Sequence, residues 1–364
     1  MTRLFAACLA FALIAGSWAS AARADDQTFS KQQLDQMLAP IALYPDDLLS
    51  NVLMASTYPL DVIEAERWRS APENANLQGD ALVNALKSKN WDPSIKALVQ
   101  FPDVLKMMSD QLDWTQKLGD AFLAQQDDVM NEVQFLRSKA DSSGHLKSNA
   151  QQTVTEDGGA YVIRPVNPDT VYVPVYEPSV VYGPWWYPDY PPYYWGYPGA
   201  VFSDGFFWGA AGIAIAGGIW GWNHWDWHNR RIDINVNRWN SINGNHRHRA
   251  TNNVWKHDPH HRGSVPRGDK NFSRADIEHR LKETDRSALH NNNINHGAEL
   301  RRNGRQFSKA RNVRSKPSHA RGGGARKFEK HNRPHPARAR AHVRRPAAHA
   351  HRGGGGHHGG RRRR

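Results

Sequence analysis

The stretch MLAPIALYPDDLLSNVLMASTYP, residues 37–59, decides the fold of the ordered part of this chain. The apolar side chains after Pro45 recur at the spacing of one helix face: Leu48, Leu49, Val52 and Leu53. Pro45 and Pro59 each stand where a helix begins, because proline is tolerated at the first helical position. The stretch therefore predicts two consecutive helices, one after each proline.

Further helix signals flank this stretch. Ser30 followed by Gln33 forms a capping box, and Asp92 before Pro93 is a strong helix start. Apolar spacing predicts two more helices, over residues 80–89 and over about residues 113–139. We therefore expect a helical domain over residues 25–149, with residues 27–145 able to fold on their own.

An aromatic–proline–aspartate unit occurs twice, at residues 44–46 and 101–103. One interpretation is a repeated way of starting a helix, since an aspartate near a helix N-terminus stabilises it. The alternative is an acidic site built at the helix starts. We favour the first interpretation.

The N-terminus carries the features of a secretory signal peptide. Arg3 precedes an apolar run over residues 4–16, and the small residues Ala22 and Ala24 stand before Asp25 as in a cleavage site. We predict that residues 1–24 are removed on export. The single cysteine, Cys8, lies inside that segment, so the mature chain has no disulfide. The expected location is the periplasm, free or associated with a membrane.

Residues 150–200 are predicted to form a β and aromatic–proline segment. Asp157 and the two glycines after it are a hairpin signal. A ten-residue repeat follows, in which residues 167–174 align with residues 177–184 and predict short edge-like strands. Nine aromatic residues then lie between Tyr182 and Tyr197. We predict that five of them contact a partner: Trp185, Trp186, Tyr193, Tyr194 and Trp195. The alternative is that these rings cover the helical domain.

Residues 201–228 form a stretch rich in glycine and tryptophan. No charged residue occurs in residues 205–222, and aromatic side chains stand at both ends of that run. Such a pattern is typical of a segment at a membrane interface, so we expect membrane insertion or shallow membrane contact at 205–222. A buried glycine-rich helix and a collapsed linker are the alternatives.

Long motifs in this chain resemble a bacterial family known as domain of unknown function 3300. They include residues 37–46, residues 52–59, residues 113–122 and residues 171–176, and the likeness extends over residues 30–262. The resemblance implies an exported protein of Gram-negative bacteria. It implies no activity, cofactor or catalytic residue.

Candidate chemistry is sparse. His224, Asp226 and His228 would share one face of a strand and make a plausible ligand set for a divalent metal. We expect weaker, nonspecific metal binding by the histidines of the tail and no other cofactor. Sequence motifs of serine hydrolases, P-loop enzymes and dinucleotide-binding enzymes are absent. The enzyme class therefore stays open, with a noncatalytic protein favoured.

The second part of the chain is strongly basic. Residues 1–227 hold 14 Lys and Arg against 26 Asp and Glu, whereas residues 228–364 hold 34 against 9. We divide this part into an Asn- and His-rich segment, residues 229–262, and a basic tail, residues 263–364, that is disordered by composition. Polyanion contacts are predicted at eight arginines: Arg338, Arg340, Arg344, Arg345, Arg361, Arg362, Arg363 and Arg364.

Export determines which polyanions the tail meets. Lipopolysaccharide and acidic phospholipid carry phosphates that guanidinium groups bind in pairs of hydrogen bonds, whereas nucleic acid is not an expected partner outside the cytoplasm. No protein partner is indicated. The alternatives to this envelope-binding hypothesis are a hydrolase of envelope polymers and a His-rich metal-binding protein.

Together these patterns predict a mainly α-helical domain with a small β and aromatic–proline segment, a Gly-rich apolar stretch and a disordered basic tail. Only 39% of residues are hydrophobic, against roughly 45–50% in an average globular chain. A uniformly folded enzyme is therefore not expected. The favoured function is noncatalytic association or scaffolding at the cell envelope.

Overall fold

The computed structural model describes residues 28–196, 200–209, 211–244 and 249–262, with isolated positions up to Lys282. Eight helices come first in the described chain: α1 (Lys31–Leu38), α2 (Asp46–Ser56), α3 (Pro59–Ser70), α4 (Gly79–Leu86), α5 (Pro93–Leu98), α6 (Pro102–Asp110), α7 (Leu112–Ala124) and α8 (Gln126–Ser142). The prediction that this part is mainly helical is confirmed. The predicted signal peptide and nearly all of the basic tail lie outside the described residues.

Local signals begin the helices as predicted. Ser30 and Gln33 make a complete capping box at α1, and the Asp92 carboxylate accepts from the Ser94 amide at 2.8 Å at the start of α5. Prolines stand at the first position of α3, α5 and α6. These signals act within one helical turn, which is why the sequence shows them.

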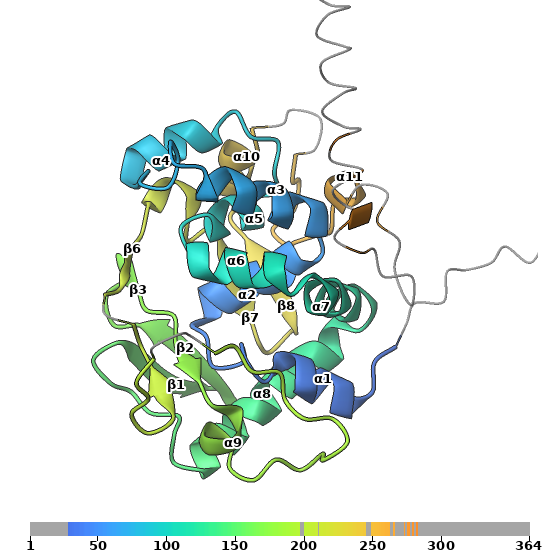
Figure 1. The fold of residues 1–364 in the computed structure, drawn as a ribbon, viewed down its shortest axis with the longest axis vertical. Helices are drawn as coiled ribbons and strands as arrows, with labels where there is room; N and C mark the ends of the chain where they lie inside the picture. The colour runs from blue at the N-terminus through green and yellow to red at the C-terminus, as the bar shows by residue number, and fades with distance from the viewer. Residues whose placement is uncertain are drawn as a thin grey trace, which may run out of the picture. The chain divides into compact units, whose positions relative to one another are not determined.

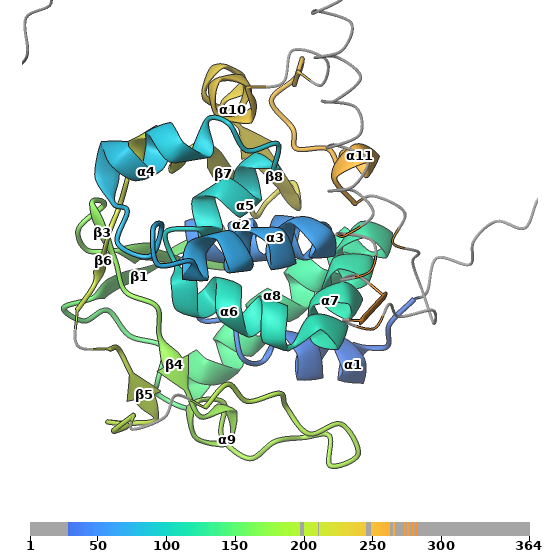
Figure 2. The ribbon, with the colours of Figure 1, turned by 45° about the horizontal axis from the view of Figure 1, so that its top comes forward.

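Helix α2 lies at the centre of the bundle. It packs against α3, α5 and α7 and against strand β7 (Asn223–Asp226), as Figures 1 and 2 show. Asp47 is the only one of its residues that is not buried. The helix therefore contributes to the core on several sides, and its buried residues include the polar Asp46, Ser50 and Asn51.

One predicted helix is wrong in its extent. The single helix expected over residues 113–139 is broken into α7 and α8 at Gln125, whose φ is −147°. The Gln125 side chain exchanges two hydrogen bonds with the Phe29 backbone, at 2.5 and 3.0 Å. This contact spans 96 residues, so no local pattern indicates the break.

The β structure consists of paired short strands. A hairpin joins β1 (Gln152–Asp157) to β2 (Ala160–Pro165) through Gly158 and Gly159, whose φ angles are +58° and +85°, so the predicted hairpin is confirmed. The other antiparallel pairs are β3 (Thr170–Val171) with β6 (Ile213–Ala214), β4 (Val175–Tyr176) with β5 (Phe206–Phe207), and β7 with β8 (Arg231–Ile234). Four further helical elements lie among and after these strands: α9 (Pro178–Val181), η1 (Gly217–Ile219), α10 (Val236–Asn243) and α11 (Pro259–Arg262).

One expectation and one alternative for residues 167–222 are corrected, whereas membrane contact at 205–222 stays a prediction. The second copy of the ten-residue repeat forms α9 and not a strand, because Pro178 occupies the first helical position there. The run at 205–222 is not a helix: it forms β5, β6 and η1, joined by turns in which Gly205, Gly209 and Gly221 have positive φ. In the described part of the chain, no helix has both the length and the apolarity needed to cross a membrane.

One hydrophobic core runs through the described chain. Its buried side chains extend from Phe29 in front of α1 to Trp255 beyond α10, and they include Tyr176, Trp220 and Trp225 from the β part. The helices therefore share their core with the segments that follow them. Whether residues 27–145 also fold alone stays a prediction, which circular dichroism of that fragment would test.

Candidate functional site

A pocket of about 340 Å³ opens between the β1–β2 hairpin and the β7–β8 hairpin, over the first turn of α2. The side chains in its wall that carry charge, or can gain it, are Asp46, Asp47, Asp157, Arg164, His224, Asp226, His228 and Asp233. The indoles of Trp225 and Trp227 complete the wall. The pocket therefore combines an aromatic surface with both acidic and basic groups.

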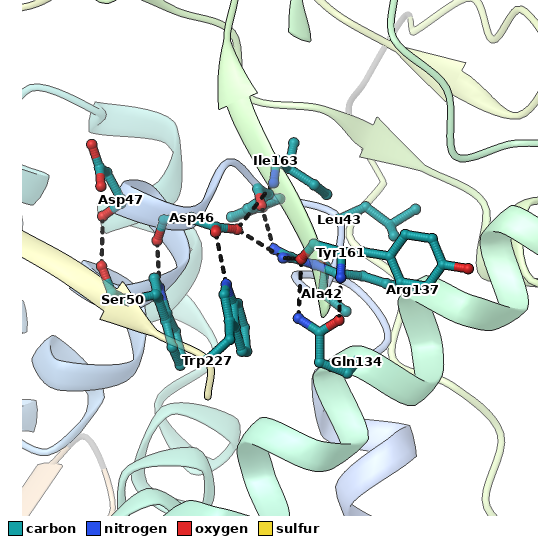
Figure 3. A network of polar contacts seen from close by, with 12 residues as sticks. Ala42, Leu43, Asp46, Asp47, Ser50, Gln134, Arg137, Tyr161, Ile163 and Trp227 are labelled. Carbon is teal, nitrogen blue, oxygen red and sulfur yellow. Dashed lines mark hydrogen bonds and ion pairs between the residues drawn. The ribbon is translucent and has the colours of Figure 1, made fainter. Parts of the chain in front are cut away.

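A buried ion pair fixes one side of the pocket (Figure 3). The Arg137 guanidinium on α8 is fully buried and lies 2.7 Å from an oxygen of Asp46. It also donates to three backbone carbonyls, at Ala42, Tyr44 and Tyr161, over 2.8–3.1 Å. Gln134 exchanges two further hydrogen bonds with the Tyr161 backbone. Arg137 thereby joins the loop before α2 to strand β2.

The Asp46 carboxylate is fully occupied. Besides Arg137, it accepts from the Ile163 amide at 3.3 Å and from the Trp227 indole at 2.9 Å. Trp227 itself stacks on Trp225, with ring centroids 4.2 Å apart, and the Arg137 guanidinium lies 5.0 Å from its centroid. Asp46 therefore joins α2 to α8, to β2 and to Trp227. This structural role differs from the predicted helix start, because no side chain caps the first turn of α2.

Asp47 differs from its neighbour. It lies in the pocket wall, and no hydrogen bond from a described residue reaches its carboxylate. Burial, reinforced by the negative charge of Asp46, raises the pKa of Asp47 to about 6, against the opposing effects of His224 and Arg164. A carboxyl group that titrates near neutral pH inside a pocket is a functional-site candidate. Sequence reasoning missed Asp47; the signal that could have found it is the doubled aspartate after Pro45.

The three predicted metal ligands all line this pocket. His224 and Asp226 belong to β7, whereas His228 lies beyond its end and is exposed. Asp226 accepts two hydrogen bonds from Asn229 and lies 3.2 Å from Arg231, and the Asn229 bonds lower its pKa. Among the residues that the structure describes, no group of three or more His, Cys, Asp or Glu side chains is placed to hold a metal ion.

Replacing Asp47 with asparagine is expected to raise the free energy of unfolding at pH 7 by about 1–3 kcal/mol. The folded state holds the Asp47 proton up to about pH 6, whereas the unfolded chain releases it near pH 4. The wild-type free energy of unfolding therefore falls as the pH rises from about 4 to 6, because the folded state must then carry a buried charge at Asp47. Urea unfolding at pH 4, 5, 6 and 7 measures the effect.

The Asp47→Asn gain should disappear near pH 4, where wild type is protonated too. Asp157→Asn, on the exposed hairpin turn of the same pocket, is the control and should show no such gain. An Asp47→Asn gain that stays constant from pH 4 to 7 would show that burial does not penalise the charge.

Four of the five predicted aromatic contacts pack against the core: Trp185, Trp186, Tyr193 and Trp195. Trp186 donates its indole N–H to Asp35 at 2.8 Å, and Trp195 meets Trp114 edge to face at 4.9 Å. Tyr194 is 46% exposed. These rings cover α1, α7 and α8, which is the alternative interpretation of this segment.

Sequence reasoning missed a buried acid pair beneath Trp186. Asp35 on α1 and Glu132 on α8 are hydrogen-bonded to each other, and both are almost fully buried. Burial and the Glu132 bond raise the pKa of Asp35 to about 7. Lys31 lies 2.7 Å from Glu132 and balances one of the two charges. Asp35 joins the aromatic segment to α1 by accepting from the Trp186 indole.

The remaining predicted contacts divide between the core and the undescribed tail. Within residues 205–222, Phe206, Ile219, Trp220 and Trp222 are buried. The eight arginines of the polyanion prediction, from Arg338 to Arg364, lie outside the described residues.

Comparison with known proteins places these features in a family. Residues 30–257 match the family described as "Protein of unknown function (DUF3300)". The curated "Uncharacterized protein YacH" of Escherichia coli (strain K12) is 37% identical over 317 residues, which cover 68% of this chain and 51% of that protein. The chain thus spans about half the length of this relative. No solved structure matches.

Proposed function

Because this chain belongs to the DUF3300 family, whose description assigns no function, we propose from its own physical properties that it associates noncatalytically with anionic polymers or lipids of the Gram-negative envelope. We further propose that residues 1–24 direct its export to the periplasm. Lipopolysaccharide and acidic phospholipid are the partners with the best chemical fit, since both present phosphate groups to arginine.

The separation of charge along the chain supports this proposal most directly. Residues 296–364 hold 21 Lys and Arg, two Asp and Glu and nine His, whereas residues 25–295 carry a net charge of −8. An acidic folded body joined to a long basic arm attracts polyanions to the arm alone. At physiological salt, charges interact over only about 8 Å, so the arm must reach its partner directly.

The fold covers much of the two other candidate contact surfaces, the aromatic segment and residues 205–222. The aromatic segment packs on α1, α7 and α8, and the large side chains at 205–222 enter the common core. The side chains of these two stretches that are buried in the protein are not available for lipid contact. Arm residues are therefore the stronger candidates for envelope binding.

The pocket over α2 supports a hydrolase of envelope polymers less well than it supports a noncatalytic binding protein. A carboxyl pair needs two groups available to the substrate, but Asp46 is already occupied by Arg137, Trp227 and Ile163. Asp226 is likewise held by Asn229 and Arg231. Asp233 lies 3.0 Å from Arg231, and Asp157 lies at the exposed end of the β1–β2 hairpin. The pocket therefore holds several carboxyl groups but no selected acid pair.

The mature full chain is expected to bind vesicles containing acidic phospholipid, and to bind them at least tenfold more weakly at 300 mM than at 50 mM NaCl. Each Lys or Arg near an anionic surface contributes roughly 1 kcal/mol, and salt screens that attraction. Histidines of the arm gain charge below about pH 6.5, so binding should strengthen at pH 5.5. Vesicle co-sedimentation measures both effects.

Truncation after Asn295 should abolish this binding. That position leaves α10 and α11 intact, whereas a cut near residue 240 would remove Trp255 and Arg262 from the core. Changing the eight predicted arginines to glutamine should weaken binding strongly, and changing them to lysine should weaken it far less. If binding does not depend on the salt concentration, or if the truncated chain still binds, the arm is not the part of the chain that contacts the vesicles.

A further inference from the structure

A second pocket of about 350 Å³ lies where residues 249–258 cross β8 and α10. The crossing chain is firmly attached: the Trp255 amide donates to the Ile232 carbonyl at 2.9 Å, and the Ile234 amide donates to the Asn253 carbonyl at 2.6 Å. Asn240 on α10 exchanges two hydrogen bonds with the Ala250 backbone, at 2.9 and 3.1 Å. The wall of this pocket is therefore a built part of the fold.

The rim of the second pocket is basic. Arg249, Lys256 and His260 line it and are exposed. Asp258 also lines it, but one of its carboxylate oxygens accepts from the His260 amide at 3.0 Å. The pocket therefore presents three basic side chains at its rim against one carboxylate.

Two tryptophans form the interior wall. Trp239 and Trp255 are 7% and 8% exposed, and the indole N–H of each has no acceptor among the described residues. A buried donor without an acceptor is costly. A ligand oxygen that reaches either indole would supply the missing acceptor, and the flat indole faces suit an amphipathic ring.

The chain that leaves this pocket stays attached to the fold as far as Arg262. Beyond it, the Asp258 amide donates to the Tyr58 hydroxyl at 3.0 Å, His261 lies 3.2 Å from Asp61, and Arg262 forms a buried ion pair with Asp120. These contacts fix α11 to α3 and α7.

We propose that this pocket binds a sugar phosphate, with the phosphate at Arg249 and Lys256 and the sugar ring against Trp239 and Trp255. Arginine and lysine are the side chains that bind phosphate best, and a volume of this size suits a small ligand. The inference rests on the proposed function, because it names the class of envelope group that the protein recognises.

The test titrates the mature full chain, labelled with ¹⁵N, with glucose 1-phosphate and follows the indole N–H signals. Single Trp239→Phe and Trp255→Phe variants assign the two signals. Glucose 1-phosphate is expected to shift at least one of them, with inorganic phosphate weaker and glucose without effect. Equal responses to glucose 1-phosphate and inorganic phosphate would assign the site to free phosphate and overturn the sugar.

A double variant, Arg249→Gln with Lys256→Gln, should raise the Kd for glucose 1-phosphate at least tenfold, because it removes the charged donors. Lys106→Gln with Lys117→Gln removes the same charge from α6 and α7, where both side chains pair with aspartates, and should leave the Kd unchanged. Equal loss in both double variants would overturn the pocket as the site.

The arm variant separates this inference from the proposed function. In the full chain with the eight arginines changed to glutamine, glucose 1-phosphate should bind as in wild type while vesicle binding falls. Loss of glucose 1-phosphate binding in that variant would place the ligand on the arm and overturn the pocket. If the wild-type chain binds glucose 1-phosphate but does not bind vesicles, only the proposed function is overturned.

Discussion

Replacing Arg137 with methionine is expected to destabilise the protein by about 5 kcal/mol or more, enough to remove most of the stability of a typical domain. The substitution leaves the buried Asp46 charge without its partner and takes the donor from three backbone carbonyls. Breaking a buried pair from one side costs roughly 3–5 kcal/mol before those carbonyls are counted. Urea unfolding, followed by circular dichroism, measures the loss.

Two comparisons identify the cause of the Arg137 effect. Lys117→Gln breaks an exposed pair with Asp113 on α7 and should cost no more than about 0.5 kcal/mol. Combining Arg137→Met with Asp46→Asn removes the uncompensated charge, so the double variant should be more stable than Arg137→Met alone. A double variant less stable than Arg137→Met would show that packing, and not charge, dominates.

Gly119→Ala is expected to be the most damaging single-methyl change, with a loss of about 3 kcal/mol or more. A Cβ at this position of α7 would fall on the Ser56 carbonyl and within 2.9 Å of the Thr57 amide nitrogen. Both obstacles are backbone atoms at the end of the buried helix α2, so α7 and α2 must separate. In an open helix the same change stabilises by roughly 1 kcal/mol, so the sign of the effect is diagnostic.

Gly217→Ala is the matched control. A Cβ at Gly217 meets no atom within 4 Å and its φ is not positive, so its effect should stay within about 0.5 kcal/mol. Thermal unfolding of both variants, followed by calorimetry, gives the comparison. A Gly119→Ala protein as stable as wild type would mean that α2 and α7 pack less closely than described.

Local chemistry explains most of what could be predicted from the sequence. The capping box at Ser30, the Asp92 cap and the glycine turn after Asp157 each act within a few residues, and all three are present in the structure. Helix extent was harder to predict. The break at Gln125 depends on Phe29, 96 residues away, and no apolar spacing near residue 125 records that contact.

The candidate site shows the same division. The sequence placed His224, Asp226 and His228 near one another, because a β-strand sends alternate residues to one face. It could not bring Asp47 to them, since β7 reaches α2 across more than 170 residues. Sequence reasoning also gave one role to the aspartates that begin helices. In the fold, Asp46 pairs with Arg137 while Asp47 faces the pocket with a raised pKa.

The sequence by itself determined the helical class, the starts of the helices, the β1–β2 hairpin and the separation of an acidic body from a basic arm, because these depend on neighbouring residues and on composition. Only the tertiary structure decided that the aromatic and glycine-rich stretches share the core of the helices, and which carboxylates are paired. Burial sets both outcomes: apolar rings leave water wherever a surface is available, and a buried charge persists where a partner meets it. Neither surface nor partner is a property of a short segment.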